Sequence, residues 1–203
     1  MDINKGVLLI FVKNPKRGEV KTRLAETIGD QQALQIYQRL LILTKKVTDK
    51  LNQTKQVWYS NFVPETDLWD TGNYEKRMQS GADLGERMKN AFKDVFDDGY
   101  RQVVIIGSDC AELETGILHS AFEELDDVDL VIGPSEDGGY YLLGMSLFYP
   151  DVFDNIDWST SSVFQQTVDK ATKIGLSTTL LPTLNDIDTE QDLKEFNQRH
   201  SDS

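Results

Sequence analysis

The sequence predicts a three-layer α/β domain, in which helices cover both faces of a mixed, mainly parallel sheet. Apolar runs of strand length alternate with longer segments whose apolar residues recur every three or four positions. The first run, Val7 to Val12, is apolar throughout, which is typical of a strand buried on both faces. No internal repeat or linker interrupts the 203 residues, so we expect one domain over residues 1–203.

The elements follow from these patterns in chain order. The strands are expected at residues 7–12, 56–60, 74–79, 102–106, 128–133, 139–145 and 176–181. A loop and a short helical turn are expected at 13–28. The helices are expected at residues 30–51, 84–99, 115–125, about 160–175 and from 189 onward. This alternation favours a mainly parallel sheet, because parallel neighbours need crossover helices.

Polar residues at the helix starts are interpreted as caps. The predicted N-caps are Asp30, Thr115 and either Ser159 or Thr160, followed by a capping box at Thr189 and Asp192. The glycines at 99 and 175 are expected to end the second and fourth helices.

Composition and charge exclude several classes of protein. A net charge of −13 argues against nucleic-acid and anionic-membrane partners. No apolar run approaches the roughly 20 residues that span a bilayer. A single cysteine excludes an internal disulfide, and two histidines about eighty positions apart offer no zinc cluster. We therefore expect a cytoplasmic protein.

The segment 13–23 is locally basic in this acidic chain. Its charged residues are Lys13, Lys16, Arg17, Lys21 and Arg23, with Glu19 as the single acid. This pattern suggests a site for a specific anion, and the alternative is a solvated loop whose exposed charges contribute little. Gly18 and Lys21-Thr22 lack the spacing of a Walker loop, so we do not expect an ATPase or GTPase. A loop between a strand and a helix can still hold a diphosphate.

Two acidic turns follow predicted strands. Asp109 follows the strand at 102–106, and Asp137 follows the strand at 128–133 in an Asp-Gly-Gly turn. In open α/β sheets, ligands bind at the carboxyl ends of strands, so the two carboxylates can share a divalent cation. Mg²⁺ or Mn²⁺ is expected, because hard oxygen ligands select these ions. The alternatives are a helix-capping role for Asp109 and an ordinary acidic hairpin turn for Asp137.

Three further residues are interpreted as structural rather than catalytic. Asp186 and Asp188 are either a second pair of ligands or turn and cap residues, and we favour the cap interpretation. Cys110 is interpreted as a small buried residue, because no neighbouring histidine could activate it.

The chain resembles a known family at five motifs that span about residues 7–193. They are Phe11-Val-Lys-Asn-Pro with Gly18-Glu-Val-Lys-Thr-Arg-Leu-Ala25, Gln79-Ser-Gly-Ala-Asp-Leu-Gly-Glu-Arg-Met88, Gly107-Ser-Asp-Cys110, Gly133-Pro-Ser-Glu-Asp-Gly-Gly-Tyr-Tyr141 and Asp186-Ile-Asp-Thr189. These segments resemble the bacterial glycosyltransferase-like proteins known as radical-SAM/selenodomain-associated transferase 1, some of which are linked to arsenosugar biosynthesis. That family is similar to the 2-phospho-lactate guanylyltransferases and belongs to the nucleotide-diphospho-sugar transferase (GT-A) superfamily.

The resemblance implies roles for individual residues. The nucleotide-binding residues it implies are Lys13, Arg17, Lys21 and Arg23 in the phosphate loop and Asp83 near the base or ribose. Asp109 lies where GT-A proteins carry their metal-binding acidic motif. The chain departs from a literal Asp-X-Asp there, since residues 107 and 111 are Gly and Ala. Asp137 is the expected second metal ligand, and Asp188 is the reserve.

The resemblance and the residues together predict a metal-dependent transferase in which Asp109, Asp137 and Lys21 are catalytic. The donor is a nucleotide sugar or a nucleoside triphosphate, and the acceptor is a small molecule. Glycosyl transfer is favoured, and nucleotidyl transfer and a catalytically silent nucleotide-binding protein are the alternatives. Asp137 or Glu136 could be the general base of an inverting glycosyl transfer. The segment Trp158-Ser159-Thr160 lies on the acceptor side, or Trp158 is a packing residue.

Overall fold

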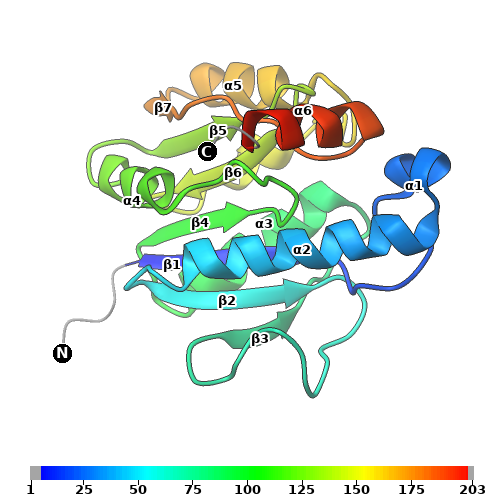
Figure 1. Ribbon diagram of the computed structural model, residues 1–203. Helices are drawn as coiled ribbons and strands as arrows, with labels where there is room; N and C mark the ends of the chain where they lie inside the picture. Colours follow the sequence, from blue (N-terminus) through cyan, green and yellow to red (C-terminus); the bar gives the residue numbers. More distant parts are fainter. Residues whose placement is uncertain (1–5, 201–203) are drawn as a thin grey trace.

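The computed structural model describes residues 6–200 and contains one seven-stranded sheet with helices on both faces (Figure 1). The strands are β1 (Gly6–Val12), β2 (Thr54–Tyr59), β3 (Glu75–Met78), β4 (Gln102–Ile106), β5 (Leu130–Pro134), β6 (Tyr140–Met145) and β7 (Thr178–Leu180). Their order is β3-β2-β1-β4-β6-β5-β7, and β6 alone runs antiparallel to its neighbours. The predicted mixed, mainly parallel three-layer fold is confirmed.

The helices follow the predicted order. They are α1 (Thr22–Ile28), α2 (Asp30–Thr48), α3 (Leu84–Asp97), α4 (Thr115–Glu124), α5 (Val163–Lys173) and α6 (Glu190–His200), with a 3₁₀ turn at Pro150–Phe153. The sequence indicated only a helical turn where α1 lies and did not predict the 3₁₀ turn. No helix in the described part of the chain is long and apolar enough to cross a membrane.

The side chains of β1 alternate between two hydrophobic clusters, one on each face of the sheet. Leu8, Ile10 and Val12 pack in the cluster that includes Tyr37 of α2 and Phe122 of α4. The intervening residues of β1 pack on the other face in the cluster that includes α3 and α5 side chains. Both faces are covered, which explains why β1 is apolar at every position.

Two of the predicted helix caps are wrong. Asp30 is the first residue of α2, and the cap position is Gly29, whose φ of 84° an L-residue rarely adopts. Thr115 is the first residue of α4, and its hydroxyl donates to the Val47 carbonyl at 3.0 Å instead of capping its own helix.

Of the caps predicted for the last two helices, the one for α5 is wrong and the one for α6 is confirmed. Helix α5 begins after Ser162, and neither Ser159 nor Thr160 caps it. The Thr160 hydroxyl instead accepts the Ser162 N–H at 3.3 Å in the preceding turn. The capping box before α6 is confirmed, because the Asp192 carboxylate accepts the Thr189 N–H at 2.6 Å and Thr189 Oγ1 accepts the Asp192 N–H at 3.3 Å.

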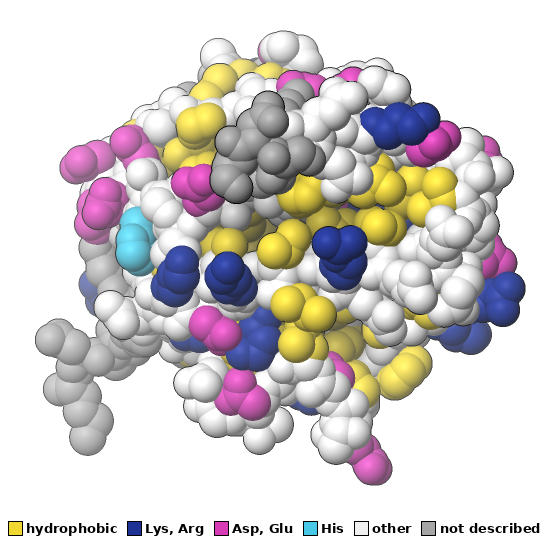
Figure 2. All heavy atoms as spheres, viewed as in Figure 1, with side chains coloured by type: hydrophobic (Ala, Val, Ile, Leu, Met, Phe, Trp, Pro, Cys, Tyr) yellow, Lys and Arg dark blue, Asp and Glu magenta, His cyan; other side chains and the backbone are white. Residues whose placement is uncertain are grey.

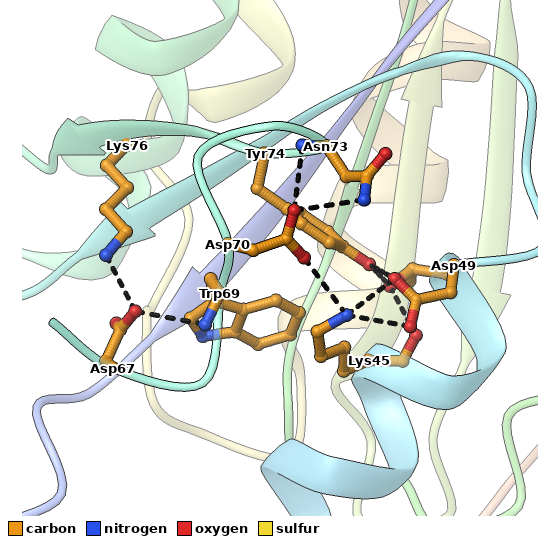
Figure 3. A network of polar contacts seen from close by, with 9 residues as sticks. Lys45, Asp49, Asp67, Trp69, Asp70, Asn73, Tyr74 and Lys76 are labelled. Atoms are coloured by element: carbon orange, nitrogen blue, oxygen red, sulfur yellow. Dashed lines mark hydrogen bonds and ion pairs between the residues drawn. The ribbon is translucent and has the colours of Figure 1, made fainter.

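The segment between β2 and β3 is fixed by a group of ionic contacts, here named the Lys45 cluster (Figure 3). Its members are Lys45, Asp49, Asp67, Asp70 and Lys76. Trp69 and Tyr74 pack inside it with ring centroids 5.0 Å apart. The cluster joins the end of α2 to the 67–74 segment that precedes β3, so this connection is held by side chains rather than by secondary structure.

The parallel strands end at one edge of the sheet, on the side where α1 lies in Figure 1. The chain runs outward from β1 through β2 to β3 and then returns to β4 beside β1, so the crevice between β1 and β4 is a topological switch point. On the face shown in Figure 2, acidic and basic side chains are interspersed, and hydrophobic ones form a band between α6 and α2.

Candidate active site

A cavity of about 900 Å³ opens at the carboxyl edge of the sheet. It is lined by residues that follow each parallel strand: Lys13 and Asn14 after β1, Ser60 and Asn61 after β2, Gln79 and Asp83 after β3, Ser108 and Asp109 after β4, Ser135 and Asp137 after β5, and Asp186 and Asp188 after β7. The sheet therefore gathers residues up to 175 positions apart around one space, as the switch-point rule requires.

Lys21 lies at the centre of the charged part of this cavity. Its Nζ is 2.8 Å from Asp188 Oδ1 and 3.2 Å from Asp109 Oδ1, and its side chain is 3% exposed. The residue adopts a left-handed backbone conformation, with φ 49° and ψ 47°, immediately before α1. Non-glycine residues pay about 1 kcal/mol or more for such a conformation, and it recurs at functional sites.

The charges of this group shift one another's pKa values. Burial alone would lower the pKa of Lys21, but Asp109 and Asp188 outweigh it and raise the pKa. Burial would raise the pKa of Asp188, and the Lys21 ammonium outweighs it and lowers the pKa. Lys21 and Asp188 are therefore held as a charged pair.

Asp186 completes the group, which we name the Lys21 cluster: Lys21, Asp109, Asp186 and Asp188. Its backbone pairs with Cys110 in an isolated bridge, which brings the segment after β7 beside the turn after β4. Its Oδ1 is buried and has no hydrogen-bond partner among the described residues. Burial, together with the nearby charges of Asp109 and Asp137, raises the pKa of Asp186 to about 7.

Asp137 lies in the turn between β5 and β6. Its Oδ1 accepts the Ser135 hydroxyl at 2.6 Å and the Gly139 N–H at 3.0 Å. Asp137 and Asp109 line the same cavity, and both act on Asp186. The side chain that shares Lys21 with Asp109 is Asp188. The choice of Asp137, with Asp188 in reserve, as the second metal ligand stays a prediction.

The interpretation of Asp186 and Asp188 as cap or turn residues is wrong. The Asp188 N–H donates to Asp192 Oδ2 at 3.0 Å. The Asp188 carboxylate accepts from Lys21 rather than from the N–H groups of a helix. Asp186 has a buried oxygen without a hydrogen-bond partner among the described residues, and burial, together with the charges of Asp109 and Asp137, raises the pKa of its carboxyl group. The sequence signal was present, because an Asp-Ile-Asp run follows an expected strand, but capping explained it equally well.

Only some of the basic residues in the segment 13–23 reach the cavity. Lys13, Lys21 and Arg23 line the cavity, whereas Arg17 is exposed and is not among the lining residues. Lys16 is ion-paired with Glu19. The assignment of Lys13, Arg17 and Arg23 to nucleotide binding stays a prediction.

Asp83 has a structural role beside its predicted one. It is the N-cap of α3, where its Oδ1 accepts the Glu86 N–H at 2.8 Å. The Glu86 carboxylate in turn accepts the Ala82 N–H at 2.6 Å. Asp83 also lines the cavity and is exposed, so its predicted contact with a base or ribose remains sterically open.

Two buried polar residues that the sequence did not single out hold the loops together. The Tyr37 hydroxyl, from α2, accepts the Lys13 N–H at 2.8 Å and lies 3.2 Å from Ser108 Oγ. Asn14 bonds the backbone of Phe62 through its amide group, at 2.9 Å. No local pattern signals this role of Tyr37, because its hydroxyl partners lie on separate turns that the sequence does not connect.

Cys110 is confirmed as a buried residue. Its Sγ contacts the Asn185 carbonyl at 3.8 Å, and burial raises the pKa of its thiol, so a reactive thiolate is disfavoured.

The donor set fits a hard divalent cation bound together with a ligand. Six acids and four bases line the cavity, so an anionic substrate adds to an existing excess of negative charge. The unpartnered Asp186 oxygen can accept a cation without losing an internal bond. Within residues 6–200, no three carboxylate, histidine or cysteine side chains already form a metal cage. Mg²⁺ commonly uses one or two carboxylates plus substrate phosphates, which this arrangement can supply.

The comparisons with known proteins agree with the fold. The family model described as "Uncharacterized protein conserved in bacteria (DUF2064)" matches residues 27–160. The chain belongs to this family. A crystal structure from Desulfovibrio desulfuricans G20, described as a "putative nucleotide-diphospho-sugar transferase", is 36% identical to this chain. It matches with a TM-score of 0.91, over 99% of this chain and 90% of its own.

More distant structures share the fold alone. A 4-diphosphocytidyl-2C-methyl-D-erythritol synthase from Anaerococcus prevotii DSM 20548 is 9% identical, with a TM-score of 0.59 over 97% of this chain and 96% of its own. The inositol-1-phosphate CTP transferase of T. maritima is 14% identical, with a TM-score of 0.56 over 92% and 90%. No curated protein matched the chain. The α/β fold is thus of the nucleotide-diphospho-sugar transferase type and is shared with nucleotidyltransferases.

Proposed function

We propose that this protein is a metal-dependent transferase that takes a glycosyl group from a nucleoside-diphosphate sugar. The observation that supports the proposal most is the Lys21 cluster, where two aspartates share one lysine and a buried Asp186 oxygen has no partner among the described residues. A cluster short of positive charge, beside a basic loop, is suited to a cation and an anion that bind together.

The carboxylates of Asp109 and Asp186 are the proposed first contacts of the cation, with Asp188 or Asp137 completing the set. When bound, Mg²⁺ or Mn²⁺ neutralises negative charge that develops on the leaving diphosphate. The Asp137 carboxylate is already oriented by Ser135 and Gly139, and its Oδ2 is not engaged in either bond.

The basic loop supplies the proposed phosphate contacts. Lys13 and Arg23 line the cavity and are exposed, so both can reach an incoming diphosphate. The Lys21 ammonium is held by Asp109 and Asp188, which fixes its position before substrate arrives. Lys21 thus acts by orienting the two acids and by presenting a fixed positive charge. Asp83, at the start of α3, is the proposed contact for the base or ribose.

Nucleotidyl transfer is the second candidate. The fold is shared with a 4-diphosphocytidyl-2C-methyl-D-erythritol synthase and an inositol-1-phosphate CTP transferase. In that reaction a phosphate of the acceptor attacks the α-phosphorus of a nucleoside triphosphate and pyrophosphate leaves. Both reactions use the same acids and the same basic loop.

A thermal-shift panel tests the proposal. The protein is heated with nucleoside di- and triphosphates and nucleotide sugars, with and without Mn²⁺, and ligand binding raises the melting temperature by mass action. We expect a nucleoside diphosphate or its sugar to stabilise the protein only with the metal, and Asp109→Asn to abolish this stabilisation. Equal stabilisation of Asp109→Asn and the unaltered protein would leave only a silent binding protein.

The bound nucleotide is then incubated with candidate acceptors. Release of nucleoside diphosphate supports glycosyl transfer, and release of pyrophosphate supports nucleotidyl transfer.

A further inference from the structure

One wall of the cavity carries no charge. It is formed by Tyr140, Trp158, Ser159, Thr160 and Ser161, with Leu84 from the start of α3 beside it. We name residues 158–161 the acceptor wall. Three of its four members carry a hydroxyl group, and the fourth presents an indole ring that is half-buried.

The acceptor wall and the basic loop belong to opposite faces of the sheet. Trp158 packs against the core cluster of the α3 and α5 face, whereas Val20 of the basic loop belongs to the cluster of the α2 and α4 face. Arg87 is the one base from α3 that lines the cavity, and its Nε–H donates to the Gly81 carbonyl at 3.2 Å. The uncharged part of the lining is thus the segment 158–161 itself.

The wall is held rigidly at both ends by glycines. A Cβ at Gly85 would lie 2.0 Å from the Trp158 ring, so the indole rests directly on the backbone of α3. The ring also stacks on Phe153 with centroids 6.3 Å apart. A Cβ at Gly138 would lie 2.0 Å from the Ser161 carbonyl oxygen, which joins the wall to the turn that carries Asp137.

The hydroxyl groups of the acceptor wall differ in whether they form hydrogen bonds within the protein. The Thr160 hydroxyl donates to the Asp157 carbonyl at 2.7 Å and lies 2.7 Å from Ser162 Oγ. Neither the Ser159 nor the Ser161 hydroxyl has a hydrogen-bond partner within the described residues, and both line the cavity. Ser159 has a φ of 64°, a strained conformation for a serine that recurs at binding sites.

We infer that this wall binds a neutral saccharide as the acceptor and that Trp158 and Ser161 select it. An indole face packs against the apolar C–H face of a sugar ring, and the free hydroxyls exchange hydrogen bonds with the ring hydroxyls. Residues 158–161 themselves offer no cation to a phosphorylated acceptor, and the adjoining turn carries the Asp137 carboxylate, which repels it. This inference rests on the proposed function and deepens it, since it assigns the nucleophile to a saccharide hydroxyl rather than to a phosphate. The hydroxyl oxygen bonds to the anomeric carbon of the donor as the bond from that carbon to the nucleoside diphosphate breaks, and the hydroxyl proton passes to Asp137 Oδ2.

Tryptophan fluorescence provides the test, because Trp158 is half-buried while Trp58 and Trp69 are each 2% exposed. The protein is first loaded with Mg²⁺ and the nucleoside diphosphate that stabilises it most. Acrylamide quenching is then titrated with methyl glucoside, methyl galactoside, maltose and glucose 6-phosphate. We expect at least one neutral saccharide to protect Trp158 and to bind about tenfold more tightly than glucose 6-phosphate.

Matched variants localise the binding. Ser161→Ala should weaken saccharide binding about fivefold, the worth of one hydrogen bond, whereas Ser162→Ala should leave it unchanged. Trp158→Ala should weaken binding about tenfold, and Trp158→Phe should retain most of it, with fluorescence replaced by calorimetry for both. Nucleotide binding should be unchanged in all four variants.

The outcomes separate this inference from the proposed function. Absence of metal-dependent nucleotide binding in the unaltered protein overturns the proposed function. Nucleotide binding without protection by any neutral saccharide overturns the inference alone. Equal or tighter binding of glucose 6-phosphate, or equal losses in Ser161→Ala and Ser162→Ala, also overturns it.

Discussion

The Lys45 cluster and the Lys21 cluster contain the same kinds of side chain and differ in how completely they are satisfied. In the Lys45 cluster, the carboxylate oxygens of Asp49, Asp67 and Asp70 each accept from a lysine, a hydroxyl or an N–H group (Figure 3). In the Lys21 cluster, one lysine serves two aspartates and the Asp186 Oδ1 has no partner among the described residues.

The pKa values of the two clusters follow this difference. Although burial opposes it, bonds from Lys45 and Tyr74 lower the pKa of Asp49. Burial and neighbouring acids raise the pKa of Asp186 to about 7. A satisfied polar cluster stabilises a connection, whereas an unsatisfied buried acid costs stability and is retained where a ligand completes it. The comparison therefore assigns structure to one cluster and chemistry to the other.

Trp69→Ala should produce the largest loss of stability, because it empties the packed centre of the Lys45 cluster. Trp69 is 2% exposed and packs edge-on against Tyr74. We expect the free energy of unfolding to fall by about 4 kcal/mol in urea denaturation. Trp69→Phe, which keeps an aromatic ring, should lose clearly less. A loss below about 1 kcal/mol for the alanine variant would show that the 67–74 segment is not fixed by this packing.

Lys21→Met should destabilise the protein by about 2 to 3 kcal/mol at pH 8. The substitution leaves Asp109, Asp186 and Asp188 without their shared cation, and the partial exposure of Asp109 and Asp188 limits the loss. Added Mg²⁺ should restore a large part of the stability, because it replaces the missing positive charge. A loss that Mg²⁺ does not reduce would contradict a cation site in this cluster.

Asp186→Asn should change the pH dependence of stability by about 2 kcal/mol. The pKa of Asp186 is about 7 in the folded protein and near 4 when unfolded, so between pH 4 and 7 the folded state binds more protons. The free energy of unfolding therefore falls as the pH rises from about 4 to 7, because the folded protein must give up a proton that it holds more tightly. Above pH 7 the full loss is present. The asparagine variant should gain stability relative to the unaltered protein between pH 5 and pH 8. A difference that is constant with pH would show that Asp186 is not the titrating group.

Lys45→Met should have the smallest effect, about 1 kcal/mol. Lys45 is 19% exposed and its partners Asp49 and Asp70 are over a third exposed, so solvent replaces most of the lost contact. Mg²⁺ should not restore stability, in contrast to its effect on Lys21→Met. Equal recovery of both variants by Mg²⁺ would remove the distinction between the two clusters.

The elements could be predicted because their signals are local. The unbroken apolar run of β1 and the three- and four-residue spacing of α2 each predict burial without reference to the rest of the chain. Helix caps were less predictable, since the preference for Asp30 or Thr115 as a cap does not say which residue begins the helix. Gly29 takes the cap position of α2 because of its backbone freedom, which a preference for polar caps overlooks.

The site was predicted in outline and not in its pairings. Strand order predicts that Asp109 and Asp137 lie at one sheet edge, and both line one cavity, while their sharing of a cation stays a prediction. The partner of Asp109 on Lys21 is Asp188, which depends on how the segment after β7 crosses beside β4. Contacts of that kind join residues 167 positions apart, so no local pattern encodes them.

Titration of Mn²⁺ together with a nucleoside diphosphate, followed by calorimetry, tests the cation site most directly. We predict that the unaltered protein binds the nucleotide only with Mn²⁺, and that Asp109→Asn weakens this ternary binding about 100-fold. We predict the same direction for Asp186→Asn, while Lys45→Met binds like the unaltered protein. Equal nucleotide affinity with and without Mn²⁺, or full binding by Asp109→Asn, would contradict the assignment of chemistry to the Lys21 cluster.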